Sequence, residues 1–214
     1  MNQVVKDKMQ REIMVVKNDI LFSRNKRTQW LLDKKCSFEK IILENYEYMV
    51  RWQAEVNFDY KQPIPYGVVV SEDKKVFVYK RGGAGSNAGE ARLHSKMSFW
   101  VGWHIEVDDR VSPNLLRETL LREVEEEIKI NENDVVNISV LGYINDDMNE
   151  VGKVHFWVAY AIEVSTYNFA LEDGELDNGE FLTLADIDAL LATGDYNLEP
   201  WSVILHDEIK KYLA

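Results

Sequence analysis

The segment from Leu115 to Ile130, LLRETLLREVEEEIKI, constrains the fold most, because its apolar residues recur with the period of an α-helix. At about 100° per residue, one stripe of this helix is apolar and is predicted to face a core. The members of the stripe are Leu116, Leu120, Val124 and Ile128. Glu118 and Glu125 fall on the opposite side, where solvated carboxylates need no functional explanation.

Three further glutamates crowd one side of the helix. Glu123 and Glu127 fall at the edge of the apolar stripe with Glu126 beside them, so that their negative charges repel one another. Two lysines could offset this charge, but oxygen ligands converging from one helix are what Mg²⁺ or Mn²⁺ prefers. Arg122 lies four residues before Glu126, where it can orient a carboxylate or form an ordinary surface salt bridge.

The run from Arg122 to Ile130 resembles the core of the Nudix box, which reads Arg-Glu, aliphatic, any, Glu-Glu, any, Gly, aliphatic. Lys129 stands where the box has glycine. The upstream half is stretched, because Asn114 and not glycine lies eight residues before Arg122.

A second stretch, LHSKMSFWVGWHIEVDD from Leu93 to Asp109, is similar to a divergent branch of Nudix-type phosphoesterases with a Gly-Gly-His-Ile loop. Trp100 and Trp103 stand at positions where glycine is expected. Their indoles could stack on a nucleobase, although packing is the more common role of a large aromatic residue.

The resemblance implies a Nudix-like α/β/α sandwich with a mixed central sheet. It also implies a hydrolase that uses Mg²⁺ or Mn²⁺ to cleave a phosphoanhydride in a nucleoside diphosphate linked to a group X. In family terms Glu123, Glu126 and Glu127 are the metal ligands, one of these carboxylates can act as the base, and Arg122 holds Glu123. Proteins of this family often form homodimers.

Weaker candidates for substrate contact are Arg92, Lys96, Gly102, His104, Asp146 and Asp147. The two cations suit phosphate, glycine lets the backbone approach it, and histidine can donate to it. The two aspartates lie in the turn INDDMNE, where Nudix enzymes often supply a further acid, and His155 follows on the next strand. Solvated charges, a hydrogen-bonded histidine and ordinary turn formation are the alternatives. The missing upstream glutamate of the box could be replaced by Glu106, Asp108 or Asp109. Alternatively, these three residues form an exposed acidic turn.

The 214-residue chain is long enough for one α/β domain, and its net charge of −12 argues against general binding to nucleic acids, which requires basic patches. One cysteine, Cys36, excludes an internal disulfide framework. The sequence contains no run of 18 or more apolar residues and no signal-peptide pattern, so we expect a cytoplasmic protein without a membrane segment.

Periodicity and capping signals predict the remaining elements. The predicted strands are Ile13–Lys17, Tyr66–Val70, Lys75–Tyr79, Val136–Ile144, Val154–Val164 and a short one near Phe181. The predicted helices are Phe38–Trp52, one opened by Ser112 as N-cap with Pro113 as first residue, one opened by the capping box Thr183–Asp186, and one beginning at Pro200. Asn57–Pro65 is expected to be a connector and Arg81–Gly89 a flexible loop. We assign residues 1–58 to an extension and 59–214 to a Nudix-like domain.

Two other functions stay open at this point. A catalytically weak Nudix-fold protein that senses a nucleotide would bind its ligand without releasing phosphate. A Ca²⁺-binding or acidic interaction module would have no nucleotide role, and no nucleotide would change its melting temperature.

Overall fold

The structure is a computed structural model of the chain, and it describes residues 3–24, 27–81, 96–107, 112–171, 176–194 and 197–214. The predicted loop after Arg81 and the candidates Arg92, Asp108 and Asp109 lie outside these ranges. The chain divides into two compact units. The first comprises residues 1–66, 102–120 and 142–159, and the second comprises residues 67–101, 121–141 and 160–214.

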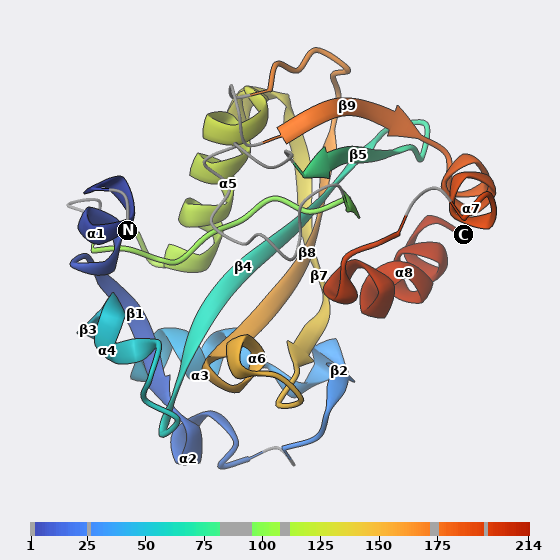
Figure 1. Cartoon of the computed structure of the whole chain (residues 1–214). Coiled ribbons are helices and arrows are strands. Elements are labelled where there is room, and N and C mark those ends of the chain that lie inside the picture. The colour runs from blue at the N-terminus through green and yellow to red at the C-terminus, as the bar shows by residue number, and fades with distance from the viewer. Residues whose placement is uncertain (1–2, 25–26, 82–95, 108–111, 172–175, 195–196) are drawn as a thin grey trace. The chain divides into compact units, whose positions relative to one another are not determined.

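The helices and strands are labelled in Figure 1. The first unit holds α1 (Gln3–Met9), β1 (Glu12–Lys17), α2 (Asn18–Leu21), β2 (Trp30–Leu32), α3 (Phe38–Asn45), β3 (Glu47–Val50), α4 (Arg51–Ala54) and α6 (Glu150–Val154). The second holds β5 (Val76–Arg81), β6 (Met97–Ser98), β9 (Leu176–Leu182), α7 (Leu184–Ala192) and α8 (Pro200–Leu213). Four elements run through both: β4 (Tyr60–Ser71), α5 (Leu115–Ile128), β7 (Val135–Asn145) and β8 (His155–Val164).

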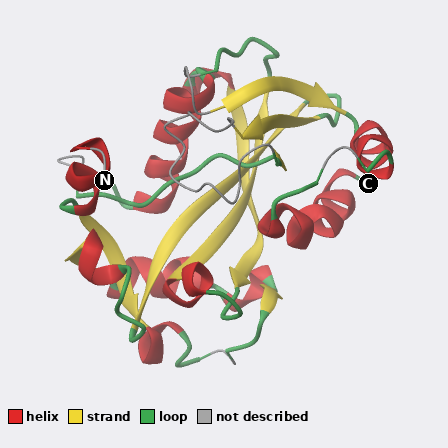
Figure 2. Ribbon diagram, viewed as in Figure 1, coloured by secondary structure: helices red, strands yellow, loops and turns green. Residues whose placement is uncertain are grey.

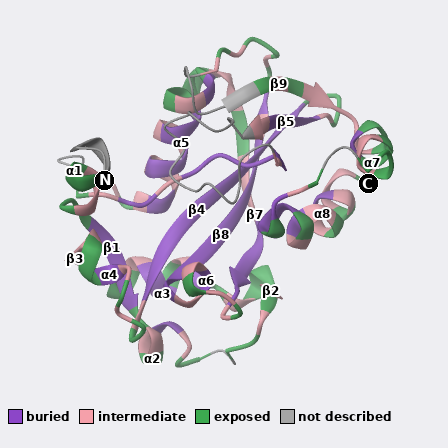
Figure 3. Cartoon of the chain, viewed as in Figure 1, coloured by how far each residue is buried: buried purple, intermediate pink, exposed green. Residues whose placement is uncertain are grey.

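Helices and a largely antiparallel sheet make up the fold, as Figure 2 shows, and this confirms the predicted α/β class. The strand order is β2-β7-β8-β4-β1-β3, and β5 pairs with β4, β6 and β9. Strands β4 and β8 are buried along almost their whole length (Figure 3). Burial on both faces explains why the sequence of β8, HFWVAYAIEV, is a nearly continuous apolar run without alternation.

Several predicted elements are confirmed. Strands β4 and β5 pair antiparallel with Val70 opposite Val76, as the hairpin prediction required. Helix α7 begins with the predicted capping box, in which Thr183 and Asp186 cap each other's backbone N–H groups. Helix α8 begins at Pro200, and Trp201, Leu205 and Ile209 are buried, whereas Ile204 and Tyr212 are half-buried.

Two predicted boundaries are wrong. The predicted helix Phe38–Trp52 ends at Asn45, because Glu47–Val50 forms strand β3 and pairs with β1, with Met49 opposite Ile13. The predicted connector Asn57–Pro65 is mostly strand, because β4 begins at Tyr60. Its start pairs with β1, with Lys61 opposite Val16, and the two prolines lie after this pairing. Within the described ranges, none of the helices combines the length and apolarity needed to cross a membrane.

Candidate active site

Helix α5 carries the predicted metal ligands, and it begins later than the sequence suggested. The side-chain oxygen of Asn114 accepts from the N–H of Arg117 at 3.2 Å, and its carbonyl accepts from Glu118 at 3.1 Å, so Asn114 is the N-cap. Ser112 accepts instead from the N–H of Asn114 at 3.2 Å. The predicted start at Ser112 and Pro113 is therefore wrong, because asparagine caps a helix as well as serine does.

The apolar stripe of α5 is buried as predicted, at Leu116, Leu120, Val124 and Ile128. Glu125 is exposed, as expected for the opposite side. The three crowded glutamates differ in burial: Glu123 is only 5% exposed, Glu127 is half-buried and Glu126 is exposed. The carboxylates therefore form a gradient from the edge of the core to the solvent.

Arg122 binds two of these carboxylates. Its Nη2 lies 2.5 Å from Oε1 of Glu123, and its Nη1 lies 2.7 Å from Oε2 of Glu126. Burial alone would lower the pKa of Arg122, but the charges of Glu123 and Glu126 outweigh burial and raise it. The guanidinium is thus charged at every physiological pH and orients Glu123 and Glu126 together.

Lys129 follows the last residue of α5 in a left-handed backbone conformation, with φ of 55°. This is the position where the Nudix box has glycine, and a helix very often ends on a left-handed residue. The side chain of Lys129 donates to the carbonyl of Glu126 at 2.7 Å and so contributes to the end of the helix. Lys129 thus has the left-handed backbone conformation that glycine adopts at a lower free-energy cost.

Gly102 allows close contact between two backbone segments. Its φ is 154°, and a Cβ at this position would lie 1.9 Å from the carbonyl oxygen of Pro65 in β4. The sequence predicted that this glycine lets the backbone approach phosphate. In the structure, the close contact is instead with strand β4 of the protein itself. Lys96 is half-buried just before β6. Trp103 has the ammonium of Lys8 at 4.9 Å and the guanidinium of Arg51 at 5.2 Å from its ring centre, which favours the packing interpretation.

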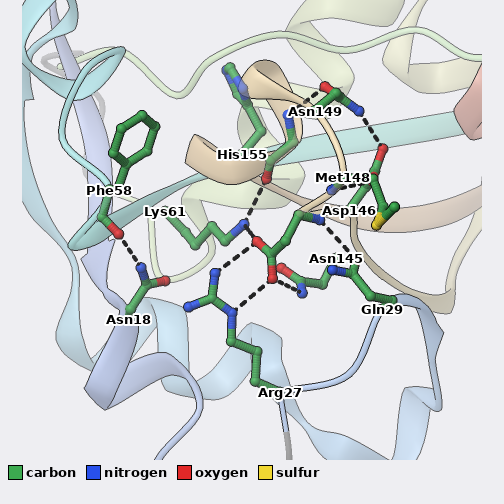
Figure 4. Close-up of polar contacts among 12 residues, drawn as sticks. Asn18, Arg27, Gln29, Phe58, Lys61, Asn145, Asp146, Met148, Asn149 and His155 are labelled. Carbon is green, nitrogen blue, oxygen red and sulfur yellow. Dashed lines mark hydrogen bonds and ion pairs between the residues drawn. The ribbon is translucent and has the colours of Figure 1, made fainter.

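Asp147 is the centre of a polar cluster in the first unit. Its carboxylate accepts from the guanidinium of Arg27 at 2.7 and 2.9 Å and from Nζ of Lys61 at 2.8 Å. Figure 4 shows Arg27, Lys61 and Asn145 directed at this carboxylate. Burial would raise the pKa of Asp147, but these hydrogen bonds lower it well below its ordinary value. Burial also lowers the pKa of Lys61, to about 8.

Asp146 closes the turn before α6. Its two oxygens accept from the N–H of Met148 at 3.0 Å and from the amide of Asn149 at 2.7 Å (Figure 4). The side chain is buried, at 3% exposure. These contacts are those of a turn-forming residue, the alternative that the sequence left open, and a role of Asp146 or Asp147 toward substrate stays a prediction.

His104 and His155 meet inside the first unit, with their Nε2 atoms 3.0 Å apart. Oε1 of Glu55, the residue after α4, lies 4.0 Å from Nε2 of His104. Burial lowers the pKa of His104 well below 6.5, and the charges of Arg51 and His155 act in the same direction. His104 is therefore a neutral imidazole at physiological pH.

Sequence reasoning did not single out Arg27, Glu55 or Lys61. Arg27 lies 120 residues from Asp147 and Lys61 lies 86 residues from it, so no local spacing indicates the cluster. The one available signal was a lysine within YKQPIPYGVVV, since a cation in an otherwise apolar strand requires a partner.

Solved structures that resemble this chain define the class of fold. Tm1382, a candidate Nudix hydrolase, is 22% identical with a TM-score of 0.72, covering 94% of this chain and 99% of its own. DR0079 from Deinococcus radiodurans is 13% identical with a TM-score of 0.52, covering 86% of this chain and 97% of its own. The Nudix domain of NrtR from Shewanella oneidensis, solved with ADP-ribose, is 14% identical with a TM-score of 0.51, covering 72% and 89%. The two neighbours described as Nudix proteins confirm the predicted Nudix-like fold.

Among curated proteins, protein YmaB of Bacillus subtilis (strain 168) is 34% identical over 208 residues, which cover 94% of this chain and 98% of YmaB. The chain belongs to the same protein family as YmaB. No family model matches the sequence.

Proposed function

We propose that this protein is a metal-dependent hydrolase that cleaves a phosphoanhydride in a nucleoside diphosphate linked to a group X. The observation that carries the proposal is the carboxylate cluster of α5 on a Nudix fold, with Glu123 and Glu126 joined by Arg122. Fixed carboxylates at the edge of a core are a suitable oxygen ligand set for Mg²⁺ or Mn²⁺. When bound, the metal would neutralise phosphate oxygens and lower the pKa of a water molecule.

The residues of α5 have separate tasks in this proposal. Glu123 is the least mobile ligand, because it is buried and paired with Arg122 at 2.5 Å. Glu126 is exposed and is paired with Nη1 of the same guanidinium. It can therefore bind a phosphate-bound metal from the solvent side. Glu127 is half-buried and completes the set. One of these carboxylates takes the proton from the attacking water.

The substrate class is a small nucleotide-type diphosphate. The net charge of −12 is unfavourable for polyanions such as nucleic acids, whereas a metal and a few local cations are enough for a small phosphate ester. The NrtR Nudix domain was solved with ADP-ribose, which makes ADP-ribose a suitable member of a substrate panel. We further propose a cytoplasmic protein in which residues 59–214 form the Nudix-like domain and which can form a homodimer.

The test is product release from a panel of nucleotide sugars, dinucleoside polyphosphates, NADH, ADP-ribose and nucleoside triphosphates, with Mg²⁺ or Mn²⁺ present. The wild type is compared with Glu127→Gln and with Glu125→Gln, whose carboxylate is exposed on the opposite side of the same helix. We expect turnover that needs metal, persists in Glu125→Gln and falls at least about 100-fold in Glu127→Gln. Binding of a nucleotide without turnover would contradict the hydrolase and support a nucleotide sensor.

A further inference from the structure

Three side chains that are far apart in the sequence converge inside the first unit. Glu55 follows α4, His104 lies in the segment after Gly102, and His155 is the first residue of β8. One ligand atom from each lies within 4.8 Å of the other two. Both histidines are buried, at 7% and 6% exposure. Nothing in the proposed hydrolysis uses this cluster, whose ligands are mostly nitrogen, unlike the carboxylates of α5.

A backbone carbonyl of α6 fixes the orientation of the His155 ring. Its Nδ1 lies 2.7 Å from the carbonyl oxygen of Val151 in α6, and a carbonyl can only accept, so Nδ1 carries the proton. Nε2 of His155 therefore presents a lone pair toward Nε2 of His104. Metal-binding histidines almost always donate their other ring N–H to a carbonyl or carboxylate in this way. Figure 4 shows the ring of His155 turned away from the side chains of Lys61 and Asn145.

The distances suit a small divalent ion. A tetrahedral ion with bonds of about 2.0–2.1 Å holds two nitrogens about 3.3 Å apart. The observed separation of the two Nε2 atoms is 3.0 Å. Oε1 of Glu55 lies 4.0 Å from Nε2 of His104, which is too long for a hydrogen bond, and it has to approach by about 0.7 Å to reach the tetrahedral separation.

Arg51 orients the carboxylate of Glu55 toward the two histidines. Nε of Arg51, four residues earlier, lies 3.1 Å from Oε1 of Glu55, the oxygen that faces the histidines. The side chain of Glu55 is 25% exposed, so solvent reaches the cluster on the side of the carboxylate. The carboxylate offsets one of the two positive charges of a divalent cation, the two imidazoles donate lone pairs, and a water molecule can fill the fourth position.

We propose that His104, His155 and Glu55 bind a divalent transition metal of the Zn²⁺ class, distinct in ligand chemistry from Mg²⁺ or Mn²⁺ on α5. Two imidazoles and one carboxylate are ligands that zinc accepts, whereas Mg²⁺ prefers oxygen alone. The ion would join the end of α4, the segment after Gly102 and the start of β8.

The test is a titration of the metal-stripped full-length protein with Co²⁺, followed by visible absorption and by competition with Zn²⁺. Tetrahedral Co²⁺ absorbs far more strongly than octahedral Co²⁺, so the spectrum separates this site from an all-oxygen site on α5. We expect one equivalent of strongly absorbing Co²⁺, displaced by one equivalent of Zn²⁺. In His155→Gln the affinity should fall by about 100-fold or more, since loss of a ligand exceeds the usual cost of losing an outer partner.

The controls separate this site from the hydrolytic one. His206→Gln replaces a histidine of α8 next to Asp188 and should leave the Co²⁺ spectrum unchanged, as should Glu127→Gln. Glu55→Gln changes a partly exposed residue and should weaken Co²⁺ binding without unfolding the protein. Absence of the strong absorption in the wild type would overturn the proposal and leave a histidine pair joined by one N–H···N hydrogen bond. Wild-type Co²⁺ affinity in the folded Glu55→Gln and His155→Gln variants would overturn it in the same way.

Discussion

Asp147 is predicted to make the stability of the fold depend on pH. Its folded-state pKa is lowered by Arg27 and Lys61, whereas the unfolded value is about 3.9. The contribution of this carboxylate is therefore present above pH about 4 and is lost as pH falls below it. Lys61 stays protonated in this range because its pKa is about 8, so the acid transition belongs to the carboxylate.

Asp147→Asn should lower the free energy of unfolding by about 3 kcal/mol at pH 7, because it leaves two cations without their charged partner. The difference from the wild type should narrow as pH falls from about 4 to about 2, because the unfolded wild-type chain then binds a proton that the folded carboxylate, with its lowered pKa, does not bind. Urea denaturation at several pH values measures both effects. A constant difference across this range would show that the carboxylate charge is not the cause.

Gly102→Ala should destabilise the protein by about 3 kcal/mol, because the new Cβ must displace backbone. The atom would lie 1.9 Å from the carbonyl oxygen of Pro65, a contact that no side-chain rotation relieves. Gly194→Ala is the matched control: its φ is also positive, but its Cβ would meet no atom within 4 Å, so only about 1 kcal/mol is expected. Equal losses in thermal denaturation would mean that strain at positive φ, and not the contact, sets the cost.

The C-terminal end of α5 has a conformational free-energy cost that a substitution can remove. Lys129→Gly should raise the free energy of unfolding by about 1 kcal/mol relative to Lys129→Ala, because only glycine adopts φ of 55° without strain. Both variants lose the hydrogen bond from Nζ to Glu126, so the comparison isolates the backbone. Chemical denaturation of the two variants measures it, and a more stable alanine variant would exclude a left-handed helix end.

The elements that the sequence predicts best are those in which a regular hydrophobic pattern reflects burial. The stripe of α5 and the long apolar strand β8 were predictable because burial leaves a regular pattern. The end of α3 was not, because Glu47–Val50 suits a helix by itself and becomes strand β3 only by pairing with β1. The first half of strand β4 was missed because Pro63 and Pro65 lack a ladder donor, which ordinarily indicates a connector.

The residues of the candidate site were also predictable only in part. Glu123, Glu126 and Glu127 lie on one helix, so their spacing in the sequence placed them together. The contacts of Asp147 with Arg27 and Lys61, and of His104 with Glu55 and His155, are long-range, and only the tertiary fold brings them together.

For the whole molecule, bound cations and stability should be linked. The net charge of −12 disfavours the compact state through self-repulsion, and the α5 carboxylates concentrate part of this charge on one helix. A ligand that binds only the folded state at 100 times its Kd stabilises it by about 2.7 kcal/mol. Mg²⁺ or Mn²⁺ should therefore raise the melting temperature of the wild type and of Glu125→Gln, and should have little effect on Glu127→Gln. An equal rise in all three would indicate nonspecific screening.

A Mn²⁺ titration followed by electron paramagnetic resonance tests whether the glutamates of α5 hold the hydrolytic metal. Free Mn²⁺ gives a strong signal that bound Mn²⁺ largely loses, so the number and affinity of sites follow from the titration. We predict Mn²⁺ binding in the wild type that Glu125→Gln retains and that Glu123→Gln and Glu127→Gln weaken at least about 10-fold. Equal Mn²⁺ affinity in all four proteins would exclude α5 as the metal-binding helix.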